Sequence, residues 1–224
     1  RKTIEARVAA EASKAAEAQA DQPIVVVGGE GWHPGVIGIV AGRLKDKLHK
    51  PAIVVGWGED FGPLARGSGR SVPGVNLGDL ISDAARAGVI EGGGGHAMAA
   101  GLSLRPEQLP ALQAYCHTHG RTSAEPIARA RILEIDAVLA PAAATGALLE
   151  LVDRLGPFGS QAPEPLFAAT RVRARFARRV GANHLAFEMQ GEDGARLRAI
   201  AFRMADGPVG GAVEEAVRTG RRLH

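Results

Sequence analysis

The chain has 224 residues, 46% of them hydrophobic and 23% charged, a composition typical of one large or two small folded domains. Its 27 Lys and Arg against 24 Asp and Glu leave a net charge of +3, which is too small to indicate a polyanionic partner by itself. The single cysteine, Cys116, excludes an internal disulfide, and no apolar run approaches the roughly 20 residues that cross a bilayer, so we expect a soluble, cytoplasmic protein without membrane contact.

Residues 3–20 consist of strong helix formers, with Ile4, Val8 and Ala12 on one stripe, and predict an amphipathic connector helix. This helix is expected to end before Pro23, since the residue preceding a proline leaves helical space. The chain begins at Arg1 rather than at a methionine and stops without a turn or cap signal. We therefore expect an internal piece of a longer protein.

Residues 24–27 and 52–55 are apolar and predict buried strands, with a helix over residues 34–49 between them. A strand, a helix and a strand in this order form a right-handed crossover between two parallel strands. Pro34 suits the first turn of the helix, where its missing N–H costs nothing. The amino end of this helix is thereby expected near the carboxyl end of the first strand, where α/β proteins bind ligands.

The next segments complete an α/β domain: an extended stretch, a helix capped by Asn76, a run of glycines, a strand and a helix. After a linker, short strands interrupted by one helix predict a small barrel or sandwich. The expected ranges are 64–72, 76–86, 92–95, 102–104 and 106–119 for the first domain, 120–130 for the linker, and strands 132–138, 166–176, 184–190 and 197–202 with a helix over 141–155 for the second.

Four successive glycines, Gly92 to Gly95, precede His96. A backbone without Cβ atoms can approach a ligand closely, and the N–H groups of Gly94 and Gly95 can point at a phosphate. His96 can then donate to that phosphate or to a nucleoside. Taken alone, the run is equally well explained as a flexible turn with a satisfied histidine.

Arginine and serine alternate with small residues in a second motif. Alternation along a strand places Arg66, Ser68 and Arg70 on one face, and Ser71 adds a second hydroxyl. A guanidinium beside a hydroxyl suits a terminal phosphate or a backbone phosphodiester. In isolation, a solvated strand face is the slightly better explanation.

Trp32 and His33 come directly before the helix that opens at Pro34. A helix amino end attracts anions, which favours a binding role for His33. For Trp32, packing in the core is preferred over stacking on a base.

A fourth candidate lies in the second domain, where Arg171, Arg173 and Arg175 alternate with Val172, Ala174 and Phe176. The arginines are expected on one strand face and the apolar residues on the other. Such a stripe can follow a phosphate backbone, as in small barrels that bind single strands, but it equally fits a half-buried strand.

Metal-dependent phosphodiester hydrolysis requires several carboxylates and histidines that converge on one or two ions. The sequence contains no Asp-His-His or Asp-x-Asp run, and its acidic residues are scattered. We therefore expect the chain to bind no metal and to cleave nothing alone.

The motifs in residues 32–39, 67–71 and 93–102, together with 156–159 and 163–167, resemble the RecJ single-stranded-DNA-specific exonucleases of the DHH/DHHA1 phosphoesterase superfamily. The glycine–histidine element occurs throughout that superfamily, and the other motifs narrow the likeness to RecJ. The resemblance implies a connector helix (1–22), a DHHA1 domain with a mixed sheet (23–122) and an OB-like barrel (127–224). The barrel is expected to be incomplete and the catalytic DHH domain to lie upstream.

The resemblance also implies 5′-to-3′ degradation of single-stranded DNA, with Mn²⁺ or Mg²⁺, in DNA repair and recombination when the catalytic domain is present. Ser68 and Arg70 match positions that hold the 5′ phosphate, and His96 with its glycines matches a loop that faces the cleft. His33 matches a position near the same cleft. The expected partners are single-stranded DNA and a single-strand-binding protein or helicase, and the oligomeric state stays open.

Two alternatives remain. One is a phosphodiesterase relative that acts on short oligonucleotides or cyclic dinucleotides, which a second strand-binding domain disfavours. The other is a non-catalytic single-strand-binding or assembly module on the same fold. Only the upstream sequence separates the second alternative from an exonuclease.

Overall fold

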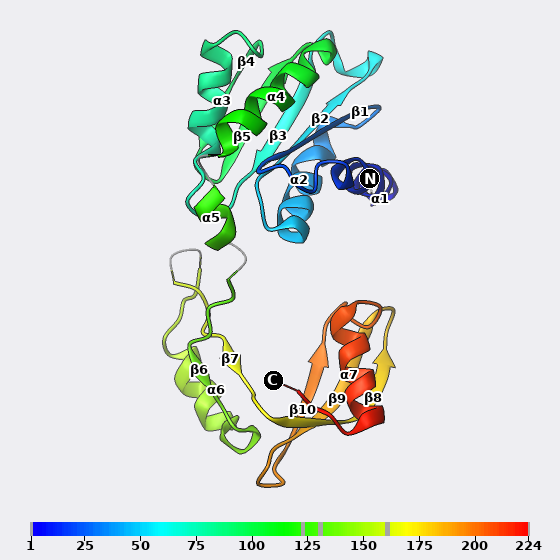
Figure 1. The fold of residues 1–224 in the computed structure, drawn as a ribbon, viewed down its shortest axis with the longest axis vertical. Coiled ribbons are helices and arrows are strands. Elements are labelled where there is room, and N and C mark those ends of the chain that lie inside the picture. Colours follow the sequence, from blue (N-terminus) through cyan, green and yellow to red (C-terminus); the bar gives the residue numbers. More distant parts are fainter. Residues whose placement is uncertain (1, 122–123, 130–131, 160–161, 224) are drawn as a thin grey trace. The chain divides into compact units, whose positions relative to one another are not determined.

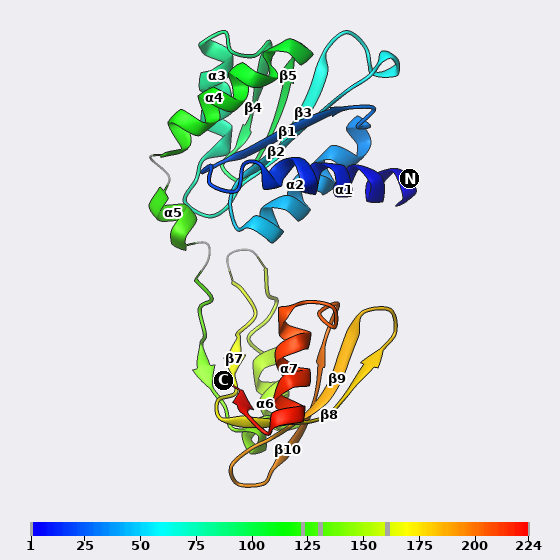
Figure 2. The same ribbon diagram turned by 45° about the vertical axis from the view of Figure 1, so that its right-hand side comes forward.

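The structure is a computed structural model that describes residues 2–121, 124–129, 132–159 and 162–223 (Figures 1 and 2). The chain divides into two compact units, Arg1–Leu133 and Glu134–His224, and each is described by itself. Within the described ranges, no helix is both long and apolar enough to span a membrane.

The first unit is built on a mixed five-stranded sheet, which confirms the predicted fold class. The strand order is β1-β2-β3-β5-β4, with β1 and β2 parallel and every other pair antiparallel. The strands are β1 (Val25–Glu30), β2 (Ala52–Trp57), β3 (Ala65–Arg70), β4 (Gly92–His96) and β5 (Ala99–Leu104). The helices are α1 (Lys2–Glu17), α2 (Pro34–Leu48), α3 (Leu77–Arg86), α4 (Leu109–Gly120) and α5 (Ala124–Arg129), with 3-10 turns at Glu59–Phe61 and Pro106–Gln108.

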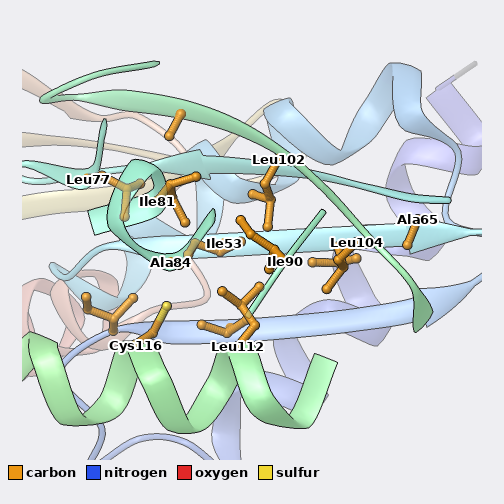
Figure 3. Packing of buried hydrophobic residues seen from close by; sticks show 14 residues of the cluster. Ile53, Ala65, Leu77, Ile81, Ala84, Ile90, Leu102, Leu104, Leu112 and Cys116 are labelled. Atoms are coloured by element: carbon orange, nitrogen blue, oxygen red, sulfur yellow. The ribbon is translucent and has the colours of Figure 1, made fainter. Parts of the chain in front are cut away.

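A separate hydrophobic core lies on each face of this sheet. On one face, α3 and α4 cover the strands, and Figure 3 shows Leu112 and Cys116 of α4 directed at the sheet. On the other face, α1 and α2 pack over β1 and β2, where Val40 and Val54 are fully buried. Among the described residues, α2 packs on β2 and β3, and the core that α1 and α2 form on this face includes no residue of β4 or β5.

Helix α1 belongs to the first unit. Val8, Ala12 and Ala16 are buried in the core that α2 shares. Trp32 is buried, and its indole Nε1 donates to Glu11 Oε2 over 2.7 Å. The tryptophan is thus a core residue, as predicted. The predicted connector helix is therefore docked along its length in this unit.

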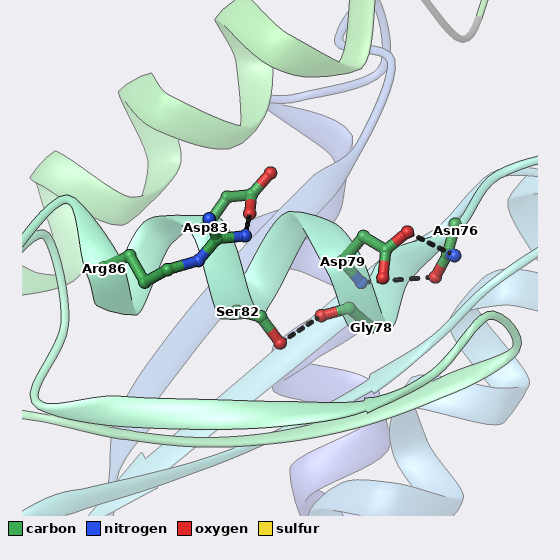
Figure 4. Close-up of polar contacts among 6 residues, drawn as sticks. All are labelled: Asn76, Gly78, Asp79, Ser82, Asp83 and Arg86. Carbon is green, nitrogen blue, oxygen red and sulfur yellow. Dashed lines mark hydrogen bonds and ion pairs between the residues drawn. The ribbon is translucent and has the colours of Figure 1, made fainter.

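Helix α3 begins at the predicted cap. Asn76 Oδ1 accepts from the backbone N–H of Asp79 over 3.2 Å, and its amide nitrogen donates to the Asp79 carboxylate over 2.7 Å (Figure 4). Farther along, the Ser82 hydroxyl donates to the carbonyl of Gly78 over 2.8 Å. The cap fixes the start of the helix. The helix starts directly against the glycine strand, since a Cβ at Gly78 would lie 2.8 Å from the carbonyl carbon of Gly95.

Two parts of this unit differ from what the sequence suggested. Residues 92–96 form the edge strand β4, and not the flexible turn that was one of the two explanations of the glycine run, because pairing with β5 and packing against α3 override the low strand propensity of glycine. The predicted linker contains helix α5, whose Ile127 is buried with Val72 and Val75. An apolar contact to the first unit thus orders a segment that was expected to be a linker.

The second unit has an open antiparallel sheet in the order β10-β9-β8-β11, and α7 covers one of its faces. Val213 and Ala216 of α7 pack against Ala174 and Leu185 of the sheet. A separate parallel pair joins β6 to β7, next to helix α6. The bounds are β6 (Ala137–Val138), β7 (Phe167–Ala168), β8 (Val172–Val180), β9 (His184–Gln190), β10 (Arg196–Ala201), β11 (Arg222–Leu223), α6 (Gly146–Asp153), α7 (Pro208–Thr219) and a 3-10 turn at Pro141–Ala143.

This unit departs from the predicted elements at several places. The strand expected over 132–138 shrinks to two residues, 166–176 divides into β7 and part of β8, and 141–155 divides into a 3-10 turn and α6. Helix α7 and strand β11 were not predicted. Phe176 was expected on the buried face, but a register shift between Arg175 and Arg178 and its φ of 55° turn it outward, and it is 69% exposed.

Candidate nucleic-acid interface

The two faces of β3 differ in character. Ala65 is buried in the core under α3 and α4, and Cβ atoms at Gly67 and Gly69 would collide with Leu102 and Leu77 of the same core. The alternate residues Arg66, Ser68 and Arg70 therefore point to the opposite face, beside α2. The structure brings these three predicted residues together.

They line a pocket of about 410 Å³ between β3 and the first two turns of α2. The helix contributes backbone and small or apolar side chains, and β3 contributes the polar groups. Gly38 makes the close approach possible, since a Cβ there would lie 3.1 Å from both Arg70 Nη2 and Ser68 Oγ. The full lining consists of Pro34, Gly35, Ile37, Gly38, Ile39, Arg66, Gly67, Ser68 and Arg70.

The Arg70 guanidinium is held from its own strand. Its Nη1 donates to Ser68 Oγ over 3.0 Å and to the Gly69 carbonyl over 2.8 Å. These bonds leave the remaining N–H donors of Arg70 for a ligand in the pocket. Two arginines and a hydroxyl, placed beside the positive amino end of a helix, are groups of the kind that bind a phosphate.

His33 is the N-cap of α2 rather than a free side chain. Its Nδ1 accepts from the backbone N–H of Gly35 over 2.9 Å, and its ring packs edge-on against Phe61 with centroids 5.1 Å apart. An accepting Nδ1 places the ring proton on Nε2, so His33 is left with one donor. It lies next to Pro34 at the rim of the pocket and is not part of the lining.

His96 lies on the same sheet face as Arg70. In the register, His96 pairs with Ala99 and Ala99 pairs with Arg70, so the three residues form one row. Two strand spacings separate the ends of this row, roughly 10 Å. The adjacent row contains Gly94, Gly101 and Ser68.

The hairpin that carries His96 is fixed at its tip. The backbone N–H of Ser71 donates to the Met98 carbonyl, and that of Leu77 donates to the Ala97 carbonyl, each over 3.0 Å. Within the hairpin, a Cβ at Gly95 would lie 2.3 Å from the Ala99 carbonyl oxygen. The two strands of the hairpin therefore approach each other closely only because residue 95 is a glycine. Since β4 is an edge strand, it keeps backbone N–H groups on its outer side.

Ser71 does not join the pocket. It is 1% exposed, and its hydroxyl donates to the Val75 carbonyl over 2.7 Å. The hydroxyl stabilises the turn between β3 and α3. We therefore assign it a structural role.

The second basic site lies on the face of the open sheet that α7 leaves uncovered. Arg173 and Arg175 are exposed there, while Ala174 between them packs under α7. They line a depression of about 340 Å³ to which Arg171, Gln190, Gly191, Glu192, Gly194 and Arg222 also contribute. Arg171 stands just before the strand with a φ of 57° and pairs with Glu192 over 3.1 Å.

Further arginines, which were not predicted as site residues, lie on this face. Register pairs Arg196 with Gln190 and Gln190 with Arg173, so Arg196 and the alternate residue Arg198 point to the same side. Arg222 of β11 pairs directly with Arg173. The alternation of Arg196, Leu197 and Arg198 carried this signal in the sequence.

Among the residues that the structure describes, no group of three or more His, Cys, Asp or Glu side chains is placed to hold a metal ion. The guanidinium, hydroxyl and backbone N–H groups of these two sites are suited to binding anions.

Comparison with known proteins identifies both units. Residues 21–117 match the DHHA1 domain model and residues 135–218 match the RecJ OB domain model. The single-stranded-DNA-specific exonuclease RecJ of Bacillus subtilis is 31% identical over 91% of this chain and 25% of its own length. The protein of the same name from Escherichia coli is 35% identical over 77% of this chain and 30% of its own length.

Solved structures agree with this result. RecJ of Thermus thermophilus in complex with Mn²⁺ superposes with a TM-score of 0.66 at 27% identity, over 89% of this chain and 28% of that chain. Its complex with Mg²⁺ gives a TM-score of 0.61 at 26% identity, over 88% of this chain and 31% of that chain. The chain spans less than a third of the length of each of these proteins. The chain belongs to the RecJ family, of which it comprises the DHHA1 and OB domains.

Proposed function

We propose that this chain is the DNA-gripping part of a cytoplasmic RecJ-like exonuclease that degrades single-stranded DNA from its 5′ end in repair and recombination. The observation that carries the proposal is the pocket in which Arg66, Ser68 and Arg70 of β3 meet the amino end of α2. The relatives are named single-stranded-DNA-specific exonucleases, which supports the substrate class.

In this proposal the pocket receives the 5′-terminal phosphate. A terminal monoester phosphate carries more negative charge and more free oxygens than an internal diester. It therefore benefits most from Arg70, the Ser68 hydroxyl and the helix amino end. His96, in the same row as Arg70, is proposed to donate to the next phosphate or to the nucleoside.

Hydrolysis is assigned to a catalytic domain outside this chain. One similar RecJ structure is a complex with Mn²⁺ and another with Mg²⁺, which supports a divalent cation in the whole enzyme. We propose that the present chain binds DNA without cleaving it. A single-strand-binding protein or a helicase is the proposed partner that delivers the strand.

The test is the affinity for two labelled single strands of equal sequence, one with a 5′ phosphate and one with a 5′ hydroxyl. Fluorescence anisotropy should show about tenfold tighter binding of the phosphorylated strand, the value of one good charge-assisted hydrogen bond. Arg70→Ala should abolish this preference. Arg86→Ala is the control, since Arg86 is an exposed α3 residue paired with Asp83.

Equal affinity of the unchanged chain for both strands would refute the 5′-phosphate assignment. Release of nucleotides by the pure chain with Mn²⁺ would refute the assignment of hydrolysis to another domain.

A further inference from the structure

We propose that Glu192 is an internal anion that competes with DNA phosphates for the arginines on the open face of the second unit. The proposal rests on the proposed DNA-binding function and assigns this residue a role in setting affinity and release. It concerns the depression of about 340 Å³ lined by Arg171, Arg173, Arg175 and Arg222.

Glu192 joins two separate segments of the chain. Its Oε1 lies 3.1 Å from Arg171 Nη2, and the same oxygen also pairs with Arg222 Nη1. Arg171 precedes β8, whereas Arg222 lies in β11 at the far end of the unit's sequence. One carboxylate oxygen thus occupies the position between two guanidinium groups that a phosphate oxygen would take.

The Glu192 carboxylate neutralises only part of the positive charge that lines the depression. Within the described residues, the ion pairs of the depression's lining are those that Arg171 and Arg222 make with Glu192. Arg173 and Arg175 are exposed beside them on the same face. A phosphodiester that approaches is first attracted by these two arginines and must then displace Glu192 to engage the others.

Displacement is physically feasible. The Glu192 side chain is 49% exposed, so its carboxylate is already partly hydrated, and rotating it into water gives up mainly solvent-exposed ion pairs, which are weak. It sits in the β9–β10 turn, which Gly191 and Gly194 close through backbone hydrogen bonds of 2.9 and 3.1 Å. The turn holds the backbone while the side chain rotates away.

Glu192 could compete with DNA for the arginines or could orient the arginines for DNA, and these two roles predict opposite effects of removing its charge on DNA affinity. If the carboxylate competes, the ion pairs must break before DNA binds, so removing its charge strengthens binding. If it merely orients Arg171 and Arg222 for the ligand, removing its charge weakens binding. The sign of the change therefore decides.

The experiment compares Glu192→Gln with Asp193→Asn in single-strand binding. Both remove one negative charge from the same turn, but Asp193 Oδ1 accepts from the Ala195 backbone N–H, which an amide oxygen can also do. We expect Glu192→Gln to tighten binding by about fivefold or more, with the salt slope steeper by about one phosphate contact. Asp193→Asn should change affinity by less than about twofold.

The double variant Arg173→Ala/Arg175→Ala distinguishes a failure of the Glu192 role from a failure of the DNA site itself. Weaker binding of this double variant, with no gain in Glu192→Gln beyond Asp193→Asn, overturns the role of Glu192 and leaves the DNA site intact. Unchanged binding of the double variant overturns both. Equal melting temperatures of all variants are checked first, so that a loss of binding is not a loss of fold.

Discussion

Arg70 and Ser68 stand two residues apart on β3, and the Arg70 guanidinium donates to the Ser68 hydroxyl over 3.0 Å. The hydroxyl orients the guanidinium toward the pocket and keeps its own proton for a ligand. Ser68→Ala removes both contributions. We expect binding of a 5′-phosphorylated strand to weaken by about three- to tenfold, as for one to two lost hydrogen bonds, with little change in melting temperature.

Gly38→Ala tests the pocket from the helix side. The added Cβ would lie 3.1 Å from Arg70 Nη2 and from Ser68 Oγ, so the phosphate donors must shift. Gly42→Ala is the matched control on α2, since its Cβ would meet nothing within 4 Å. Gly42→Ala should stabilise the fold by about 0.5–1 kcal/mol through helix propensity and leave binding unchanged. Gly38→Ala should lose binding of the phosphorylated strand, and unchanged affinity would remove Gly38 from the pocket.

Gly95→Ala should destabilise the first unit by about 1–3 kcal/mol. Its φ of 158° and a Cβ at 2.3 Å from the Ala99 carbonyl oxygen leave no space for a side chain. Gly92→Ala, five positions before Ala97 at the hairpin tip, would meet only Ser103 Oγ at 3.7 Å and should be tolerated. Urea unfolding of the two variants measures the difference. Similar midpoints would show that the hairpin can rearrange.

Glu11 makes the docking of α1 sensitive to acid. The hydrogen bond from the Trp32 indole, followed by Arg7, holds the pKa of Glu11 below its usual value of 4.5. A lowered pKa in the folded state contributes stability that is complete above about pH 4.5 and is lost as the pH falls through the lowered value.

Glu11→Gln should therefore show a smaller drop in melting temperature than the unchanged chain between about pH 7 and about pH 3. Glu17→Gln, on the same helix, is the control. An equal drop in both variants would contradict the assignment.

Cys116 should be inert in the folded chain. Burial raises the pKa of its thiol to about 12, so almost no thiolate exists at neutral pH. Reaction with an alkylating reagent should be at least a hundredfold slower, on the order expected from the thiolate fraction, than in the unfolded chain. Fast labelling of the native chain would indicate that α4 opens readily.

The sequence predicted the elements of the first unit well where periodicity is strong. The α2 helix and the strands β1 and β2 consist of apolar residues whose spacing indicates their structure directly. The glycine strand was not predictable in this way, because glycine has no side-chain pattern and β4 is specified by its partners β5 and α3. Helix α5 is likewise specified by a tertiary contact and not by its own sequence pattern, so it could not be distinguished from a linker.

The candidate site was predictable as a set of residues but not in its division of roles. Alternation correctly placed Arg66, Ser68 and Arg70 on one face of β3. It could not show that Ser71 is buried in a turn. Ser71 follows Arg70 at the end of β3, and its hydroxyl bonds to the turn and does not face the pocket. In the second unit, alternation failed at Phe176 because a bulge inserts residues into β8.

The two backbone bonds at the tip of the β4–β5 hairpin constrain how this part of the chain can change its length. With Ala97 and Met98 bonded to Leu77 and Ser71, a single inserted residue in the hairpin would either break these bonds or shift β4 by one position against β5. A shift by one position turns every side chain of the strand over. His96 would then leave the sheet face of Arg70, so deletions and insertions in this hairpin should be rejected even where single substitutions are accepted.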